Sequence, residues 1–157
     1  MTECFIGIDT SNYTTSAAIC TKDGEIVANL KIPLPVKAGE CGLRQSDAVF
    51  AHVKNLPAIM QSLNKELSEM KPLAIGVSAT PRPVEGSYMP CFLSGIAAAE
   101  SFAAAADIPL LRFSHQEGHI MAATYSAGAM HLLVREQFAA FHVSGGTTEV
   151  LLATLLQ

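Results

Sequence analysis

The chain has 157 residues, of which 50% are hydrophobic and 15% are charged. This composition is enough for one ordinary domain with a sizeable core, and it excludes an intrinsically disordered chain. The net charge is −4 and lysine and arginine form no cluster, so the sequence by itself does not indicate nucleic-acid binding.

The apolar runs are too short and too interrupted to span a bilayer, and residues 1–11 lack the basic start of a signal peptide. The four cysteines, at positions 4, 20, 41 and 91, form no CxxC motif of the kind that holds zinc or acts in redox chemistry. We therefore expect a cytoplasmic protein with free, partly buried thiols and no membrane partner.

Three strands are predicted at the start of the chain. Residues 4–9 and 16–20 are apolar runs on either side of a polar turn, and residues 25–34 alternate as in a strand. Asp23-Gly24 is typical of a tight hairpin between the second and third strands. The chain is therefore expected to open as an antiparallel three-stranded meander.

A helix is predicted from Asp47 onward, after a loop over residues 35–46. Its apolar residues recur at steps of three and four, as on one helix face, and they are Val49, Val53, Leu56, Met60, Leu63 and Leu67. Ser46 is the expected N-cap, and Asp47 is favourable at the positive end of the helix. Pro57 lies inside this pattern and should kink or break the helix.

The rest of the chain alternates strands and helices. The segments expected are a strand at 72–80, a loop at 81–90, a helix at 91–106, a strand at 109–114, a helix at 115–126 and a hairpin of 138–144 with 148–153. This order predicts an α/β fold with a mixed five-stranded sheet covered by helices. Actin-like ATPases contain this unit twice and bind nucleotide between the copies.

The sequence Ser-His-Gln-Glu-Gly-His at 114–119 follows a predicted strand and opens a helix. His115 and His119 are four residues apart, so both imidazoles lie on one helix face, as two nitrogen ligands of one metal require. The positive end of the helix favours a neutral His115. Ser114 and Glu117 also form a capping box, so a plain capped helix start is the alternative.

Two further segments carry candidate site residues. The paired glycines and hydroxyl groups at 143–148 could cradle a phosphate with backbone amides, or they could form a simple hairpin turn. Asp9 ends the first strand and could place a carboxylate near a bound metal–nucleotide, or the polar residues after it could merely make a turn.

Together, the motifs at 7–11, 52–57, 115–119 and 143–148 resemble, in order and spacing, those of the TsaD/Kae family. That family has a two-lobed actin/Hsp70-like (ribonuclease H-like) ATPase fold. It transfers a threonylcarbamoyl group from threonylcarbamoyl-adenylate to a tRNA adenosine beside the anticodon. The resemblance implies that residues 1–136 form the first lobe and that residues 137–157 begin a truncated second lobe.

The resemblance also implies a site and partners. His115 and His119 would hold iron or zinc, with a third ligand from the missing lobe, and Asp9 would be catalytic. Ser144, Gly145, Gly146 and Thr147 would line a site for ATP or an acyl-adenylate. The implied macromolecular partners are tRNA, reached through a complex, and a paralogue of the same fold or a second copy of the chain.

The sequence departs from the family pattern in three places. Tyr13 and Thr14 stand where an acidic pair is usual, and Thr147 stands where a histidine is usual. The loop at 80–88 replaces a short Gly-Pro-Gly loop and carries three larger side chains, Arg82, Glu85 and Tyr88. Because such charged groups position metals and stabilise developing charge, the sequence predicts a divergent paralogue.

Two other functions remain open at this point. A non-catalytic binding or scaffold paralogue would use exposed apolar residues of the hairpin, such as Phe138, Phe141 and Leu151, for association. A metalloprotease, as in the older family name O-sialoglycoprotein endopeptidase, would use Glu117 as the general base. That reading is disfavoured because zincins place the glutamate directly after the first histidine, where this chain has Gln116.

Overall fold

The computed structural model describes residues 1–157 except positions 12, 37–41, 135–136, 144–147 and 155–157. The chain divides into two compact units, Met1–His115 and Gln116–Gln157, which are described separately. The predicted boundary between residues 136 and 137 separates two lobes of a family fold, so this division does not test it. No helix in the described part of the chain is long and apolar enough to cross a membrane.

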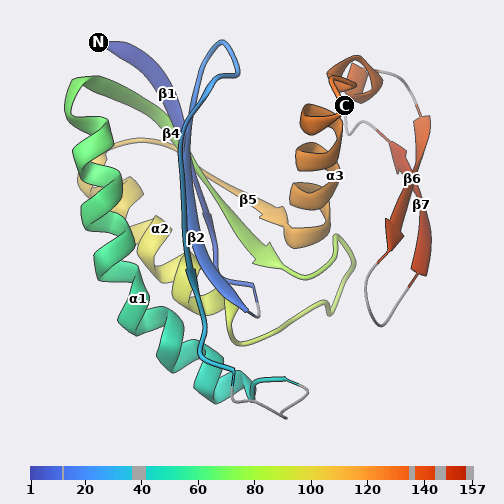
Figure 1. Cartoon of the computed structure of the whole chain (residues 1–157), viewed down its shortest axis with the longest axis horizontal. Helices are drawn as coiled ribbons and strands as arrows, with labels where there is room; N and C mark the ends of the chain where they lie inside the picture. Colours follow the sequence, from blue (N-terminus) through green and yellow to red (C-terminus); the bar gives the residue numbers. More distant parts are fainter. Residues whose placement is uncertain (12, 37–41, 135–136, 144–147, 155–157) are drawn as a thin grey trace. The chain divides into compact units, whose positions relative to one another are not determined.

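The first unit contains a five-stranded mixed sheet in the order β3-β2-β1-β4-β5 (Figure 1). The strands are β1 (Thr2–Asp9), β2 (Thr14–Thr21), β3 (Ile26–Pro33), β4 (Met70–Thr80) and β5 (Leu110–Ser114). The first three form the predicted antiparallel meander, and β4 and β5 add to it in parallel with β1. The sheet predicted from the sequence is therefore confirmed.

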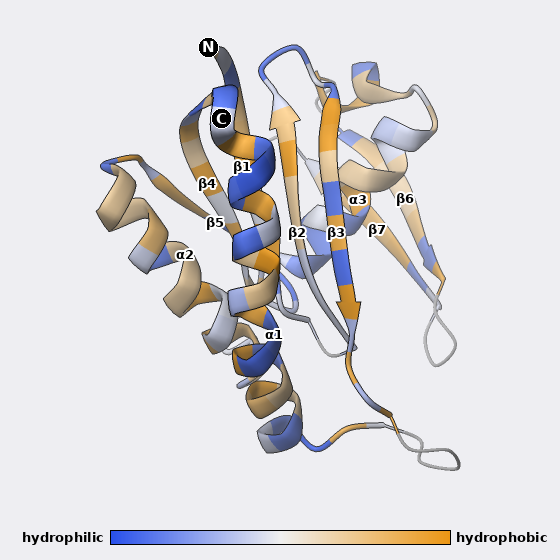
Figure 2. Ribbon diagram, turned by 60° about the vertical axis from the view of Figure 1, so that its left-hand side comes forward, coloured by the Kyte–Doolittle hydropathy of each residue, from blue (hydrophilic) through white to orange (hydrophobic). Residues whose placement is uncertain are grey.

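Two helices, α1 (Gln45–Glu66) and α2 (Phe92–Ala106), cover the same face of this sheet (Figure 1). Helix α1 packs on β2 and β3, and α2 packs on β4. The alanine-rich α2 is apolar along most of its length, whereas α1 carries both polar and apolar residues (Figure 2). Between sheet and helices lies the main core, which includes the buried residues Ile6, Ile19, Leu63, Ile75 and Ala99.

Helix α1 differs from its prediction at its start, at Pro57 and in the face that it buries. It begins at Gln45 with Arg44 as the N-cap residue and no side-chain cap, so the prediction of Ser46 as the cap is wrong. The helix also continues through Pro57 to Glu66. Pro57 lies on the exposed side, where water can bond the backbone carbonyl that loses its partner, so a break is not forced.

The buried face of α1 is also rotated from the predicted one. Its buried residues are Ala48, His52, Leu56, Ile59 and Leu63. Val53, predicted to lie in the core, is 55% exposed, whereas the polar His52 beside it is fully buried. Hydropathy alone favours valine for the core, and the structure instead buries a histidine with a hydrogen-bond partner.

The second unit contains the rest of α3 (His115–Ser126) and a two-stranded antiparallel sheet of β6 (Gln137–Val143) and β7 (Thr148–Thr154). The described residues also include two short 3-10 helices, η1 (Leu67–Glu69) in the first unit and η2 (Met130–Val134) in the second. One face of the hairpin exposes large apolar side chains, which are Phe141, Val143, Val150 and Leu152. The exposure predicted for Phe141 is confirmed, whereas Phe138 and Leu151 are only partly exposed.

Candidate functional site

The carboxyl ends of three parallel strands meet at one edge of the first sheet. Strand β1 ends at Asp9, β4 at Thr80 and β5 at Ser114, with His115 following directly. In open α/β sheets this edge is where ligands bind, because side chains and loops from several strands converge there. Asp9 and His115, two of the residues predicted to belong to the site, lie at this edge.

The Asp9 carboxylate and the His115 imidazole are in direct contact. His115 Nδ1 lies 2.8 Å from Asp9 Oδ2, although the two residues are 106 positions apart. The backbone N–H of Ser11 donates to Asp9 Oδ1 at 2.7 Å. Burial raises the pKa of Asp9, but hydrogen bonds from His115, Ser11 and Ser78 lower it by more, so the pKa lies well below its usual range. Asp9 is therefore a carboxylate that orients the His115 ring.

The ring of His115 is also held from the side of α2. The Phe92 ring meets it edge-on, with the two ring centroids 6.2 Å apart and the planes at 64°. Phe92 is almost fully buried at the start of α2, so its position is set by core packing. The imidazole thus has one polar and one apolar support, and both come from elements of the first unit.

The end of β1 is fastened to the start of α2 by Thr10. Its hydroxyl donates to the backbone carbonyl of Cys91 at 2.9 Å and accepts from the backbone N–H of Gly95 at 3.0 Å. A Cβ atom at Gly95 would lie 2.7 Å from Thr10 Oγ1, closer than real contacts allow. This close approach requires glycine at position 95 and fixes where Asp9 lies.

A second buried polar group joins the start of β2 to α1. The Thr15 hydroxyl lies 2.8 Å from His52 Nδ1, and Asn55 Nδ2 donates to the same hydroxyl at 3.1 Å. Because the Thr15 hydroxyl accepts from Asn55, it can donate its own hydrogen to His52 Nδ1, and this places the His52 proton on Nε2. That Nε2 atom is buried and has no hydrogen-bond partner among the described residues. Burial lowers the pKa of His52, so the ring is neutral.

The sequence motif at 52–57 pointed to this segment, but nothing in the sequence paired His52 with Thr15. The two residues are 37 positions apart and only the fold brings them together. The same holds for Thr10 and Gly95, which are 85 positions apart.

The other predicted site residues lie in the second unit or outside the described residues. His119 lies on α3, with its ring centroid 5.4 Å from that of His142 on β6. Ser144, Gly145, Gly146 and Thr147 are outside the described residues, so a phosphate cradle there stays a prediction. No three histidine, cysteine, aspartate or glutamate side chains in the described parts of the chain are gathered closely enough to hold a metal.

The remaining candidates occupy the loop after β4 and the cysteine positions. Arg82, Glu85 and Tyr88 are exposed, and the loop is braced by a bond from Thr80 Oγ1 to the Arg82 carbonyl at 3.0 Å. Cys4, Cys20 and Cys91 are free thiols, as predicted, and Cys41 lies outside the described residues. The capping box of Ser114 and Glu117 stays a prediction.

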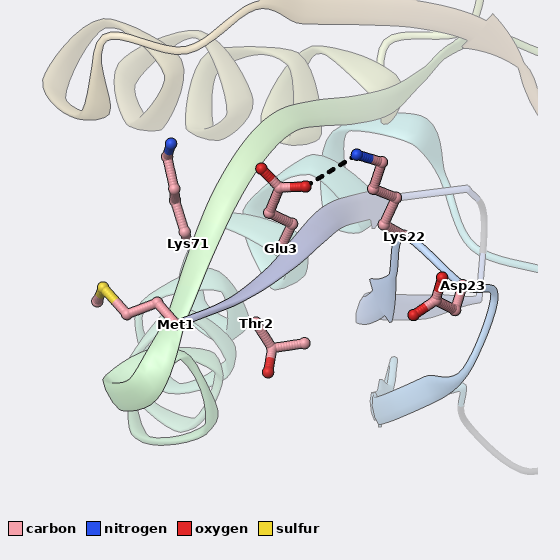
Figure 3. Close-up of a pocket in the computed structure, with 6 residues that line it drawn as sticks. All are labelled: Met1, Thr2, Glu3, Lys22, Asp23 and Lys71. Atoms are coloured by element: carbon pink, nitrogen blue, oxygen red, sulfur yellow. Dashed lines mark hydrogen bonds and ion pairs between the residues drawn. The ribbon is translucent and has the colours of Figure 1, made fainter.

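A surface pocket lies at the opposite end of β1 from Asp9 (Figure 3). Its lining residues are Met1, Thr2, Glu3, Lys22, Asp23 and Lys71. Lys22 and Glu3 form an ion pair of 3.0 Å, and their side chains are 64% and 40% exposed. An exposed pair of this kind contributes little to stability or binding, so this pocket is not part of the candidate site.

Known proteins resemble this chain in sequence and in fold. The model of a protein family described as TsaD, tRNA N6-adenosine threonylcarbamoyltransferase, matches residues 25–156. Relatives with that name in Syntrophomonas wolfei and Streptococcus sanguinis are 29% and 31% identical, over 94% and 92% of this chain. The chain spans only 42% and 41% of the length of these relatives.

The solved structures agree on the fold. YeaZ from Pseudomonas aeruginosa is similar with a TM-score of 0.57 at 18% identity, over 98% of this chain and 61% of that one. A ROK family protein from Streptococcus pneumoniae, solved in complex with sucrose, has a TM-score of 0.53 at 17% identity, over 99% and 46% of the two chains. These likenesses confirm the predicted actin/Hsp70-like, ribonuclease H-like lobe.

Proposed function

Because the chain belongs to the TsaD family, the tRNA N6-adenosine threonylcarbamoyltransferases, we propose that it takes part in transferring a threonylcarbamoyl group to a tRNA adenosine. The family model covers most of the chain, from residue 25 to residue 156. Since the chain spans less than half the length of its relatives, the proposal concerns the part of the reaction that these residues serve.

The observation that carries this proposal is the 2.8 Å contact between Asp9 and His115 Nδ1. A histidine that ligates a metal commonly donates its other ring N–H to a carboxylate, which fixes the tautomer and the ring orientation. With Nδ1 engaged by Asp9, Nε2 of His115 is the nitrogen for a metal. The donor chemistry therefore fits iron or zinc, which imidazole nitrogens bind well.

In this proposal His115 and His119, four residues apart on α3, hold the metal. The metal would supply Lewis-acid polarisation of phosphate and carbamoyl oxygens. Asp9 acts as a positioning residue that keeps His115 in its ligating orientation, which refines the catalytic role expected for Asp9. Thr10 and Gly95 in turn keep Asp9 at the edge of the sheet.

The proposal extends to substrate and partners. Ser144 to Thr147 connect β6 to β7 and would line the site for ATP or an acyl-adenylate through their backbone amides. tRNA would be reached through a complex with a paralogue of the same fold or with a second copy. We propose that this activity takes place in the cytoplasm, where tRNA substrates are found.

A binding or scaffold subunit is the second candidate. It is favoured by Tyr13 and Thr14 in place of an acidic pair, and by the exposed apolar face of the hairpin. Such a subunit would keep its association surfaces while lacking groups that handle charge. A metalloprotease is not proposed, because Gln116 occupies the position of the zincin general base.

The experiment is complementation in a strain that lacks the tRNA modification. The chain is expressed alone and with the C-terminal part of a relative as a second polypeptide, and threonylcarbamoyladenosine is measured in tRNA by mass spectrometry. Restoration in the second case, and its loss with His115→Ala, is the expected result. If the modification stays absent while both chains accumulate, the transferase proposal is wrong and the scaffold candidate leads.

A further inference from the structure

The second unit holds its own group of polar side chains, which includes two histidines. His119 on α3 and His142 on β6 have ring centroids 5.4 Å apart with planes inclined at 34°. Glu149 on β7 is the register partner of His142, and its Oε2 lies 3.7 Å from His142 Nδ1. Gln116 Nε2 donates to the same carboxylate oxygen at 3.4 Å. All four residues belong to the unit Gln116–Gln157, so the group forms within that unit.

The distance between the two rings matches a shared metal ion. A ligating nitrogen lies about 2.0–2.1 Å from zinc, and the ring centroid lies about 1.1 Å further out. At the tetrahedral angle, two such rings have centroids about 5.2 Å apart. The observed 5.4 Å agrees with this value. Simple stacking of two rings gives centroid distances of about 4.5–7 Å, so metal binding has to be tested against it.

The position of Glu149 favours one nitrogen of His142 as a ligand. The Nδ1 atom is buried, has no hydrogen-bond partner among the described residues, and faces the carboxylate across 3.7 Å. A carboxylate beside one ring nitrogen keeps the proton on that nitrogen and leaves the other as the ligand. His142 therefore has a carboxylate on its Nδ1 side, as His115 has, but at 3.7 Å and without the 2.8 Å hydrogen bond that joins Asp9 to His115.

We propose that His119 and His142 together bind a divalent transition-metal ion, with Glu149 positioning His142. This deepens the proposed function and rests on it for His119, since His142 adds a nitrogen ligand that the family motif does not supply. Within the second unit the two histidines supply two nitrogens, and the other positions of the ion stay open to further ligands. Open positions are typical of catalytic metal sites rather than structural ones.

The test measures the affinity of the purified chain for cobalt(II), by competition with a chromophoric chelator. His142→Ala should weaken binding by at least about 100-fold and Glu149→Gln by about 10-fold, as loss of a ligand and of its positioning carboxylate do. X-ray absorption should count one imidazole fewer in His142→Ala. His131→Ala is the matched control, because His131 is an exposed histidine of the same unit, and its affinity should be unchanged.

His142→Cys tests the same position if His142→Ala perturbs folding. His142→Cys offers a thiolate at the same position, so it should bind cobalt tightly and show a thiolate-to-cobalt charge-transfer band. Circular dichroism of each variant shows whether the unit is folded. A folded His142→Cys without this band, or a wild-type affinity in folded His142→Ala, would overturn the proposal and leave ring stacking.

The same measurements separate this proposal from the proposed function. If His115→Ala and His119→Ala abolish binding while His142→Ala does not, the family site stands and the role of His142 falls. If His142→Ala and His119→Ala abolish binding while His115→Ala does not, the hairpin site stands and the family pair falls. If the wild-type chain binds no cobalt, the hairpin proposal is wrong, and the family site is then tested by the complementation experiment alone.

Discussion

The two units of this chain bury apolar surface to different extents. In the first, one face of the sheet packs on α1 and α2, and residues such as Ile19, Leu63 and Ile75 are fully buried. In the second, the hairpin leaves Phe141 74% exposed and Leu152 66% exposed. The first unit thus has the core that an independent domain needs, whereas the hairpin contributes little apolar burial of its own.

The first unit also buries polar groups. The first unit places Thr10, Thr15 and His52 inside its core, where each is held by a hydrogen bond to a distant segment. These bonds determine where the edge with Asp9 and His115 lies. The side chains of the candidate site are held in fixed positions because the residues that support them are buried in a packed core. Substituting the supporting residues one at a time tests this.

The largest expected effect comes from removing core volume in the first unit. Leu63→Ala deletes a fully buried side chain that packs between α1 and the sheet, so it should lower the free energy of unfolding by about 2–5 kcal/mol. Chemical denaturation followed by circular dichroism measures this. Val53→Ala on the same helix is the control and should cost less than about 0.5 kcal/mol because Val53 is exposed. Equal costs would mean that the face of α1 predicted from hydropathy is the buried one.

The next largest effect comes from the contact between β1 and α2. Gly95→Ala would place a Cβ 2.7 Å from Thr10 Oγ1, so it should destabilise the unit by about 1–3 kcal/mol through overpacking. Gly118→Ala on α3 meets no atom within 4 Å and should be neutral or slightly stabilising, since alanine favours a helix. A stable Gly95→Ala protein would show that Thr10 does not fix the end of β1.

The sequence predicted the elements of the first unit better than the side chains that join them. Strands and helices follow from local periodicity, which is why the meander, α2 and β5 were found close to their observed limits. The Thr10–Gly95 and Thr15–His52 bonds join residues 85 and 37 positions apart, and no local pattern signals them. Hydropathy also predicted the wrong buried face of α1, because it cannot show that a buried histidine has a hydrogen-bond partner.

The candidate site was likewise predicted in part. Spacing alone put His115 and His119 on one helix, and the position of Asp9 at a strand end suggested a carboxylate in the site. The contact between Asp9 and His115 could not be predicted, because it depends on β1 and β5 lying on either side of β4 with both carboxyl ends at one edge. His142 and Glu149 were missed because their pairing depends on the hairpin register.

A smaller effect should appear in the pH dependence of stability. Burial lowers the pKa of His52 in the folded state, so below about pH 6.5 the unfolded chain binds a proton that the folded chain does not. Stability should therefore fall as the pH falls below about 6.5, by up to about 1.4 kcal/mol per pH unit from this residue. Denaturation at several pH values measures the slope, which should be smaller in His52→Gln and unchanged in His131→Gln.

The smallest expected effect is on the hairpin. Phe141→Ala removes a large side chain, but 74% of it is exposed and its register partner Val150 is 65% exposed, so little apolar burial is lost. The free energy of unfolding should change by less than about 0.5 kcal/mol, against the 2–5 kcal/mol expected for Leu63→Ala. If Phe141→Ala instead costs more than about 1.5 kcal/mol, this face is covered in solution. The difference in apolar burial between the two units would then hold only for the separate chain. If a second copy of the chain covers this face, the loss of stability in Phe141→Ala should depend on protein concentration.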